Sequence, residues 1–501
     1  MEEIWMQTIT KNIEKINLDK QYGSFIDGEF VESSNGYIDA INPANGELLS
    51  KIARGNKEDI DRAVKAANEA FKTWSKTSIE ERSAYLHKIA DVLEENTERL
   101  STIECLDTGR PIHEFALDYG LAVQQFRYFA SAILTYEGTS RPLPGGQLLV
   151  QKDPLGVCAQ IIPWNVPMIM VSFKLAPALA AGNTIVMKPA EDASLSTLEF
   201  AKLLKDVLPK GVINFVTGYG IEAGDALINH PDVHKLSFTG SVGIGRLVGK
   251  TAGERLLPVT LELGGKSPHI VFPDVNIDDA VENVTLGYCL FNGQSCILGS
   301  RLFIHDDIYD EFLEKLVARA KEVKVGDPTD PSTRVSALIN EKQGKRVLGY
   351  IDIAKEEGAK LLVGGTRVTV PNNEHGYFIE PTIFEATNDM RISQEEIFGP
   401  VITVMRWKDV DAVIEEANDI DYGLAAGIMT NDFKAALDTA QKLQAGSVWI
   451  NQYFNFQTGA PFGGYKNSGV GREYGKEALD EYTQAKTIAA NFNLPPAGFF
   501  K

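Results

Sequence analysis

From residue 156 the chain alternates short apolar runs with helical patterns, and this alternation constrains the fold more than any other feature. The runs VCAQII, NTIVMKP, VINFVTG, VHKLSFTG and PVTLEL are separated by segments such as MIMVSFKLAPALAAG. Strand, helix and strand at this spacing form parallel sheets with helices on both faces. A second series of the same kind begins at residues 268–272 and runs to about residue 450. We therefore predict an α/β protein with two doubly wound parts, the second carrying Cys296.

The first 150 residues show a different pattern. FIDGEFVE predicts a hairpin around Asp27 and Gly28, because an Asp-Gly pair tolerates the left-handed backbone of a two-residue turn. Helical patterns follow at about residues 58–74 and then up to residue 107. Later in the chain, another helix is predicted to begin at Ser196, which has Glu199 at capping-box spacing.

Two extended segments have no sequential partner. Residues 140–156, SRPLPGGQLLVQKDPLG, combine prolines and a Gly-Gly turn with short apolar runs, and residues 483–492 near the C-terminus also predict a strand. Pairing between subunits explains both segments, and packing within one chain explains them as well.

Length and charge exclude several classes of protein. A chain of 501 residues exceeds the size of one hydrophobic core, so more than one domain is expected. Its 68 acidic and 49 basic side chains give a net charge of −19 without a basic patch, so we expect no nucleic-acid or membrane partner. Residues 154–173 carry no charge, but the polar and proline residues among them indicate a buried strand and helix rather than a membrane span.

The cysteines and the N-terminus indicate a reducing compartment. Four cysteines, at positions 105, 158, 289 and 296, are too few and too scattered for a disulfide framework or a CxxC metal site. The first residues are acidic where a signal peptide is basic. We therefore expect a cytoplasmic protein without a metal site.

Three residues could carry chemistry. Cys296, in FNGQSCILGSR, is either a core residue or a nucleophile. Glu262, in LELGGKSP, is either exposed at a strand end or partly desolvated, with a raised pKa suited to a base. Asn165 stands between two prolines in IIPWNVP, and a rigid side-chain amide there can donate to an oxyanion or simply belong to a turn.

A second group of residues could bind a nucleotide. FTGSVGIG, residues 238–245, follows a predicted strand and opens a helix, so its backbone N–H groups suit a pyrophosphate, although its glycines do not match GxGxxG and a plain turn is the alternative. Lys188 and Glu191 end the preceding apolar strand, where doubly wound sheets hold ribose; alone, they would be surface charges.

Taken together, these stretches resemble the aldehyde dehydrogenase superfamily over nearly the whole chain. The matching motifs occur in the family's order and spacing. They are PWN at 163–165, KPAE at 188–191, FTGS at 238–241, LELGGKSP at 261–268, GQSC at 293–296, EEIFGPV at 395–401 and PFGGYKNSGVGRE at 461–473.

The resemblance implies roles for five catalytic residues. Cys296 would be the nucleophile, and Asn165 would stabilise the oxyanion together with the Cys296 backbone N–H. Glu262 would be the base that activates water to hydrolyse a thioester, with Lys174 and Glu473 supporting it in moving protons. This chemistry oxidises an aldehyde to a carboxylic acid with a nicotinamide cofactor and requires no metal.

The resemblance also implies the binding residues. Lys188, Glu191 and Glu396 would hold the cofactor riboses and Phe398 would pack near the nicotinamide, with NAD favoured over NADP. The other cofactor-binding residues implied are Ile162, Pro163, Trp164, Phe238, Gly240, Ser241 and Leu263. An apolar pocket without a guanidinium, which favours medium-sized aliphatic or aromatic aldehydes, would be lined by Val166, Phe173, Ser295, Ile297, Phe456 and Phe462.

The implied architecture is an α/β aldehyde dehydrogenase-like fold with a Rossmann-like cofactor domain, an α/β catalytic domain and a small β oligomerisation extension. The cofactor domain would comprise residues 1–134 and 155–264, and the catalytic domain residues 265–467. Residues 135–154 and 480–501 would form the contacts of a homo-oligomer, either a dimer or a tetramer.

Two departures from the family pattern and two alternative functions remain. The family commonly reads FNQGQ before the nucleophile, whereas Phe291 and Asn292 occupy the Asn-Gln places, and Val242 replaces the usual Thr after FTGS. A coenzyme-A-acylating enzyme is one alternative, but such relatives generally lack a base at the position of Glu262. A catalytically silent structural protein is the other, against which Cys296, Glu262 and Asn165 argue.

Overall fold

The computed structural model describes residues 16–494 and 499, and its first half is built on an eight-stranded sheet. The strands are β1 (Ser24–Ile26), β2 (Glu29–Val31), β7 (Val157–Ile161), β8 (Thr184–Lys188), β9 (Ile213–Phe215), β10 (Lys235–Thr239), β11 (Val259–Glu262) and β24 (Gly469–Val470). Their order is β2-β1-β9-β8-β7-β10-β11-β24, and the five central strands run parallel. The predicted doubly wound pattern is confirmed here.

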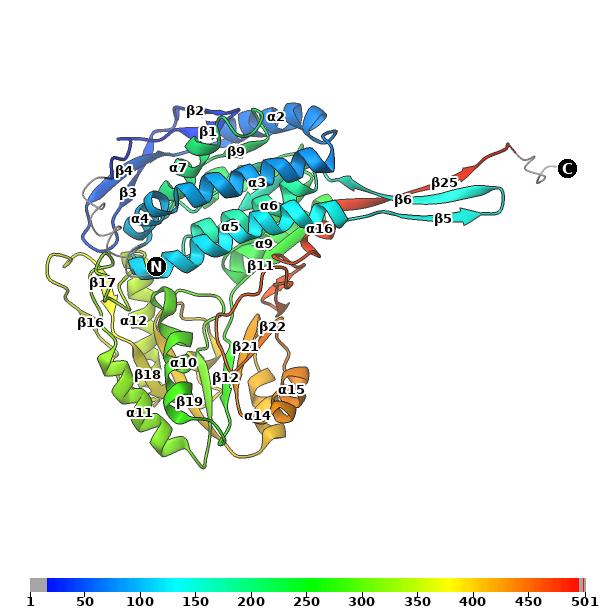
Figure 1. The fold of residues 1–501 in the computed structure, drawn as a ribbon. Coiled ribbons are helices and arrows are strands. Elements are labelled where there is room, and N and C mark those ends of the chain that lie inside the picture. The colour runs from blue at the N-terminus through cyan, green and yellow to red at the C-terminus, as the bar shows by residue number, and fades with distance from the viewer. Residues whose placement is uncertain (1–15, 495–498, 500–501) are drawn as a thin grey trace.

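Helices cover both faces of this sheet (Figure 1). They are α2 (Lys57–Trp74), α3 (Ile79–Glu95), α4 (Thr97–Thr108), α5 (Phe115–Ala132), α6 (Pro167–Ala180), α7 (Leu195–Leu204), α8 (Asp225–Asn229) and α9 (Val242–Arg255), with short turns η2 (Ile112–Glu114), η3 (Ile133–Thr135) and η4 (Gly220–Gly224). Helix α6 is buried along its whole length and packs against α5 and α3; apart from Ser172 and Lys174, its residues are apolar on every side. It opens with Pro167, whose missing N–H is tolerated in the first turn.

The second half contains a seven-stranded sheet of order β15-β18-β19-β13-β12-β21-β22, parallel except at the β15–β18 edge. The strands are β12 (Pro268–Val271), β13 (Arg301–His305), β15 (Lys360–Val363), β18 (Thr382–Glu385), β19 (Val401–Trp407), β21 (Ala425–Met429) and β22 (Ser447–Ile450). The helices are α10 (Ile277–Cys289), α11 (Tyr309–Glu322), α12 (Glu341–Glu356), α13 (Arg391–Gln394), α14 (Val410–Asn418) and α15 (Phe433–Lys442).

Smaller elements connect these layers. They are β3 (Tyr37–Ile41) with β4 (Leu48–Ala53), β14 (Ala337–Leu338) with β16 (Arg367–Val368) and β17 (Tyr377–Ile379), β20 (Tyr422–Gly423) with β23 (Tyr465–Lys466), η5 (Leu290–Gly293) and α16 (Ala478–Glu481). The predicted hairpin is confirmed, since β1 and β2 meet at Asp27 and Gly28 with φ values of 55° and 79°. Among the described residues, no helix is long and apolar enough to cross a membrane.

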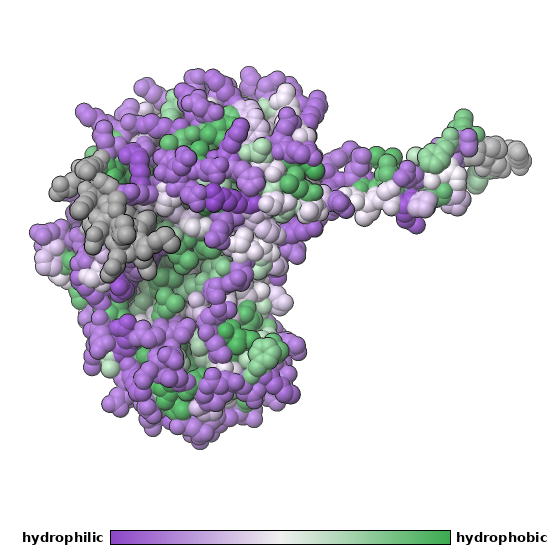
Figure 2. Space-filling view, in the orientation of Figure 1, coloured by the Kyte–Doolittle hydropathy of each residue, from purple (hydrophilic) through white to green (hydrophobic). Residues whose placement is uncertain are grey.

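The two extended segments pair within one chain. Strands β5 (Thr139–Leu143) and β6 (Gly146–Pro154) form a hairpin, and β25 (Thr483–Asn491) runs antiparallel to β6 from Thr483 opposite Pro154 to Asn491 opposite Gly146. This three-stranded sheet projects from the body of the molecule (Figure 1). Figure 2 shows hydrophobic residues interspersed along it, whereas much of the body's visible surface is hydrophilic.

One local prediction is wrong. Helix α7 begins at Leu195 after an N-cap at Ser194, so Ser196 lies inside the first turn and forms no capping box with Glu199. Glu199 makes tertiary contacts instead: its carboxylate accepts hydrogen bonds from the Tyr22 hydroxyl and the Arg99 guanidinium. Capping-box spacing is a local signal, and burial of Glu199 overrides it.

Candidate active site

The site lies where two cavities meet at the carboxyl ends of the first sheet's strands, the usual place for ligands in open α/β sheets. An apolar pocket encloses about 730 Å³ including its mouth, and a wider groove about 1150 Å³ including its open side. Asn165, Thr239 and Cys296 line both cavities. Cys296 is partly buried, so a molecule in the pocket and a molecule in the groove can both reach it.

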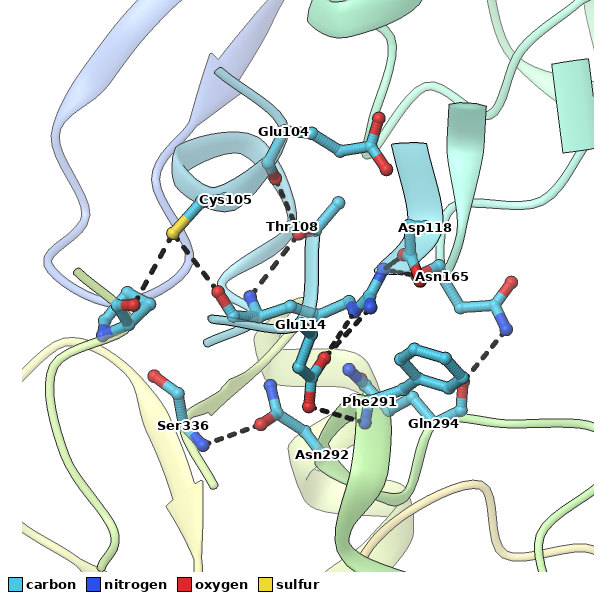
Figure 3. Close-up of polar contacts among 12 residues, drawn as sticks. Glu104, Cys105, Thr108, Glu114, Asp118, Asn165, Phe291, Asn292, Gln294 and Ser336 are labelled. Atoms are coloured by element: carbon cyan, nitrogen blue, oxygen red, sulfur yellow. Dashed lines mark hydrogen bonds and ion pairs between the residues drawn. The ribbon is translucent and has the colours of Figure 1, made fainter. Parts of the chain in front are cut away.

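Cys296 follows a turn in an unusual backbone conformation. Phe291 and Asn292 have φ values of 60° and 56°, in the left-handed region that costs a non-glycine residue about 1–2 kcal/mol. The Phe291 N–H donates to Glu114 Oε1 at 2.9 Å. The Asn292 side chain accepts from the Ser336 N–H at 2.6 Å (Figure 3). It also donates to Ala337 O at 2.9 Å. These contacts hold the turn, so the departure from the family pattern at Phe291 and Asn292 is built into the packing.

Cys296 carries a thiol that favours its protonated form. Burial raises its pKa well above the ordinary value, and the nearby Glu396 and Glu262 carboxylates raise it further. The thiol is therefore protonated at neutral pH in this form of the protein. Because the thiolate is the nucleophilic form, attack by Cys296 requires transfer of this proton.

Glu262 is a buried carboxylate with free lone pairs. It ends strand β11 and is 3% exposed, and neither of its carboxylate oxygens has a hydrogen-bond partner in the described part of the chain. Burial raises its pKa well above the ordinary value, Glu473 raises it further, and Lys174 acts in the opposite direction. Burial therefore favours the protonated form of this carboxyl group, and of the two readings of the sequence the structure shows the buried one.

Lys174 and Glu473 form a buried ion pair behind Glu262. Lys174 Nζ lies 2.6 Å from Glu473 Oε1 and 2.9 Å from Ser237 Oγ, and the Ser237 hydroxyl lies 3.2 Å from the same Glu473 oxygen. Glu473 and Glu262 both line the apolar pocket, and Glu473 Oε2 has no hydrogen-bond partner among the described residues. The three side chains place exchangeable protons next to Glu262.

Asn165 lies between strand β7 and helix α6. Its side-chain amide donates to Gln294 O at 2.9 Å, which ties it to the turn before Cys296 (Figure 3). A side-chain amide has two N–H donors, so one remains for a ligand at the junction of the cavities. The Asn165 carbonyl accepts from Arg110 Nη1 at 3.2 Å, which holds the backbone of this residue.

The groove has features that suit a dinucleotide. Glu396 Oε1 accepts the Gly265 N–H at 3.0 Å, and a Cβ atom at Gly264 would lie 2.5 Å from Glu396 Oε2, so a side chain there would displace the Glu396 carboxylate. Helix α9 begins after Ser241 without a side-chain cap from any described residue, which leaves its first N–H groups for a phosphate. Phe398 packs edge-on against Trp164, with ring centroids 5.3 Å apart.

The far end of the groove joins a further cavity of about 910 Å³ that Glu191 lines. Lys188 Nζ lies 3.0 Å from Glu191 Oε2 and also donates to Pro189 O. The Lys188 side chain is almost fully buried, whereas that of Glu191 is 29% exposed. Glu191 is therefore the member of this pair that a bound ribose would meet.

The structure brings most of the predicted residues together. All six predicted pocket residues line the pocket, and Pro163, Trp164, Gly240, Ser241, Glu396 and Phe398 line the groove. Five others do not line the groove. In the described chain, the side chains of Ile162, Phe238 and Leu263 belong to the hydrophobic core, Lys188 is buried beside Glu191, and Glu191 lines the adjoining cavity. Ile162, Phe238 and Leu263 pack in the core next to the strand ends.

Sequence reasoning missed one wall of the groove. Asn340 caps helix α12, and Gln343 Nε2 donates to Phe398 O at 2.7 Å and Ile397 O at 3.2 Å. Arg346 on the next turn donates to Glu396 O at 2.6 Å. The Asn-x-x-Gln spacing predicts a helix start, but nothing in it connects residue 343 with residue 398. The missed groove residues are Asp192, Ile339, Asn340, Lys342, Gln343 and Arg346, and the missed pocket residues include Leu117, Asp118 and Leu121 of helix α5.

The chain is similar in sequence and structure to known aldehyde dehydrogenases. The family model described as "Aldehyde dehydrogenase family" matches residues 30–488. A probable aldehyde dehydrogenase of Streptomyces coelicolor is 44% identical over 494 residues, 97% of either chain. The crystal structure of betaine aldehyde dehydrogenase from Staphylococcus aureus with NAD⁺ is 40% identical with a TM-score of 0.94, covering 96% of both chains. The NAD⁺ complex of a Bacillus cereus aldehyde dehydrogenase is 42% identical with a TM-score of 0.92, covering 95% of this chain and 100% of that one.

Proposed function

The chain belongs to the aldehyde dehydrogenase family, and from this premise we propose that it oxidises an aldehyde to the carboxylic acid with NAD⁺ through a thioester on Cys296. The position of Cys296, where an apolar pocket opens into a groove with features suited to a dinucleotide, carries the proposal. An aldehyde in the pocket and a nicotinamide in the groove would both lie beside its sulfur.

In the proposed reaction, the Cys296 sulfur bonds to the aldehyde carbon and its proton leaves to a base. The free N–H of Asn165 and the Cys296 backbone N–H stabilise the resulting alkoxide. NAD⁺ held in the groove beside Glu396 and Phe398 would supply the acceptor for the hydride of this carbon. Glu262 then takes a proton from water as the water attacks the thioester, and the carbon–sulfur bond breaks to return the Cys296 thiol. Glu473 and Lys174 pass the proton on from Glu262.

Glu262 favours hydrolysis over the two alternatives. Transfer of the acyl group to coenzyme A needs no buried base beside the thioester, whereas hydrolysis does. A structural protein has no use for a buried carboxylate with two free oxygens, since such a group destabilises the fold.

The pocket favours uncharged aldehydes of medium size. Phe173 packs against Tyr474 and Phe462, and Phe462 packs against Phe456. Among the described residues, no lysine or arginine lines this pocket, whereas Asp118, Glu262 and Glu473 do. A carboxylate on the substrate would lose its hydration and gain no cationic partner.

We therefore expect NADH formation with hexanal and benzaldehyde, at a kcat/KM at least about tenfold higher than with succinic semialdehyde, because burying an unpartnered carboxylate is costly. The measurement is NADH absorbance over a range of aldehyde concentrations. Pentanal is the matched control, since it is similar in length to succinic semialdehyde and uncharged. A higher kcat/KM for succinic semialdehyde than for pentanal would contradict the proposed pocket.

Glu191 should select the cofactor. Its carboxylate would accept hydrogen bonds from the adenosine ribose and repel a 2′-phosphate. We expect kcat/KM to be at least about tenfold higher with NAD⁺ than with NADP⁺, and Glu191→Gln to narrow this ratio by removing the charge. Asp192→Asn is the control, because Asp192 lines the same cavity and should leave the ratio nearly unchanged. An equal preference in the wild type would show that another group accommodates the phosphate.

We also propose that the projecting sheet contacts another copy of the chain in a homo-oligomer. Every residue of β25 after Thr483 is exposed, and Phe492 beyond it is 71% exposed. A three-stranded sheet with apolar residues and no second layer gains stability when another surface covers it.

A further inference from the structure

We propose that Arg110 is a positioning residue for the addition of Cys296 to the aldehyde. Arg110 would hold Asn165 and the turn before Cys296 in the one arrangement that brings both oxyanion donors onto the same oxygen. The inference rests on the proposed function and goes beyond it, because Arg110 lies in a buried cluster beneath the junction of the cavities.

Arg110 connects the two sides of the oxyanion site. Its guanidinium is fully buried, and Nη1 donates both to Asp118 Oδ2 at 2.7 Å and to the Asn165 carbonyl at 3.2 Å. Nε donates to Glu114 Oε2 at 3.0 Å. The other oxygen of Glu114 accepts the Phe291 N–H at 2.9 Å (Figure 3). One side chain therefore reaches the oxyanion donor directly and the nucleophile turn through a single carboxylate.

Contacts with aromatic rings also link Arg110 to the turn before Cys296. The Arg110 guanidinium lies 4.2 Å from the centre of the Phe291 ring and 4.6 Å from that of Phe115. A planar guanidinium can stack on a ring and donate in its own plane at the same time. Phe291, where the family commonly has asparagine, supplies the ring on the nucleophile side. The turn thus depends on Arg110 for both a stacking contact and a relayed hydrogen bond.

The turn itself needs such support. Phe291 and Asn292 are held in the left-handed region, which non-glycine residues occupy only when their surroundings enforce it. Asn165 Nδ2 also donates to Gln294 O, so the oxyanion donor and the turn are linked on their other side as well. A closed loop of contacts runs from Arg110 through Asn165, Gln294, Phe291 and Glu114 back to Arg110. Opening it at Arg110 would let the two donors move relative to each other.

Lysine cannot replace arginine in this position. An ammonium group is a single point of charge and cannot reach Glu114, Asp118 and the Asn165 carbonyl while lying over the Phe291 ring. Arg110→Lys therefore keeps the positive charge that the buried carboxylates require and removes the planar set of N–H donors. Glu104→Gln is the matched control, because Glu104 is equally buried and close to Arg110. Within the described chain its carboxylate accepts from the Tyr119 hydroxyl and its backbone carbonyl from the Thr108 hydroxyl, and it bonds with neither Asn165 nor the turn.

Two rates distinguish a positioning role of Arg110 from a general loss of structure at the active site. The first is the NADH burst with saturating NAD⁺ and hexanal, which requires the alkoxide. The second is alkylation of Cys296 by iodoacetamide, followed on its peptide by mass spectrometry. Alkylation displaces iodide from a saturated carbon and forms no oxyanion, so it reports only whether the thiol is accessible and reactive.

We expect Arg110→Lys to slow the burst by about 10- to 100-fold, because a displaced oxyanion donor costs rate on this scale. Alkylation of Cys296 should stay within about twofold of the wild type, as should both rates in Glu104→Gln. Glu114→Gln is the second variant in case Arg110→Lys does not fold. Phe291 and Arg110 donate to different oxygens of Glu114, and in glutamine one of these positions is an NH₂ group that cannot accept, so this variant should slow the burst in the same selective way.

The proposal is overturned by an unchanged burst in the folded variants, by equal losses in burst and alkylation, or by an equal loss of burst in Glu104→Gln. Absence of a burst in the wild type would instead overturn the proposed function itself, and this inference with it. Melting temperatures of all variants identify those that have lost the fold.

Discussion

Cys296→Ala should abolish aldehyde oxidation, with NADH formation falling by at least about 10⁴-fold, because the covalent route is lost and no other group in the pocket can form a thioester. Cys296 is the cysteine at which the pocket and the groove meet. Binding of NAD⁺ should persist in this variant, since Cys296 is one of fifteen residues that line the groove and alanine leaves the others in place. The measurement is NADH absorbance under saturating aldehyde and NAD⁺, with cofactor binding followed by titration calorimetry.

The other three cysteines are the controls for this variant. Cys105, Cys158 and Cys289 are buried in the core, and burial raises the pKa of each, to about 12 for Cys158 and Cys289. Their alanine variants should keep most of the activity and lose only some stability, by about 1 kcal/mol for a small buried group. Substantial oxidation by Cys296→Ala, or loss of activity in Cys289→Ala alone, would show that the nucleophile is a different residue.

What the sequence could predict depends on how local the signal is. The doubly wound pattern was readable because buried parallel strands form continuous apolar runs, as in Thr184–Lys188. Cys296 and Glu262 are predicted as site residues because their motifs resemble those of a known family, and Glu262 also lies at the end of a strand. The pocket residues Phe173, Phe456 and Phe462 followed from the same resemblance, and they line one cavity.

The features that could not be predicted are contacts between residues far apart in the chain. Nothing near Arg110 indicates that it reaches Asn165 and stacks on Phe291. The pairing of β25 with β6 joins residues more than 320 positions apart, so a strand without a sequential neighbour left two explanations open. Ser196 shows the opposite error, in which a local capping signal was overridden by the tertiary contacts of Glu199.

Glu262 is placed to act in either half of the reaction. Burial raises its pKa and that of Cys296, and the two groups line the same pocket, so Glu262 could take the proton of the thiol or that of the hydrolytic water. The two roles differ in what happens before the first turnover is complete. If Glu262 mainly deprotonates the thiol, a variant without this carboxylate forms NADH slowly from the start. If it mainly deprotonates water, the variant forms the first NADH rapidly and the thioester accumulates.

We propose that activation of water is the main role, and Glu262→Gln should then keep a stoichiometric NADH burst while steady-state turnover falls by about 10²- to 10⁴-fold, the usual contribution of general base catalysis. Glutamine keeps the size of the side chain and cannot accept the proton. Mass spectrometry after mixing with aldehyde and NAD⁺ should find the acyl group on the Cys296 peptide.

In the wild type, turnover should rise with pH as Glu262 loses its proton, since the raised pKa keeps it protonated at lower pH, and Glu262→Gln should lack this rise. A slow burst without an acyl adduct would assign Glu262 to the thiol. Normal turnover in both phases would make it a structural carboxylate, and the two free oxygens would then need another explanation.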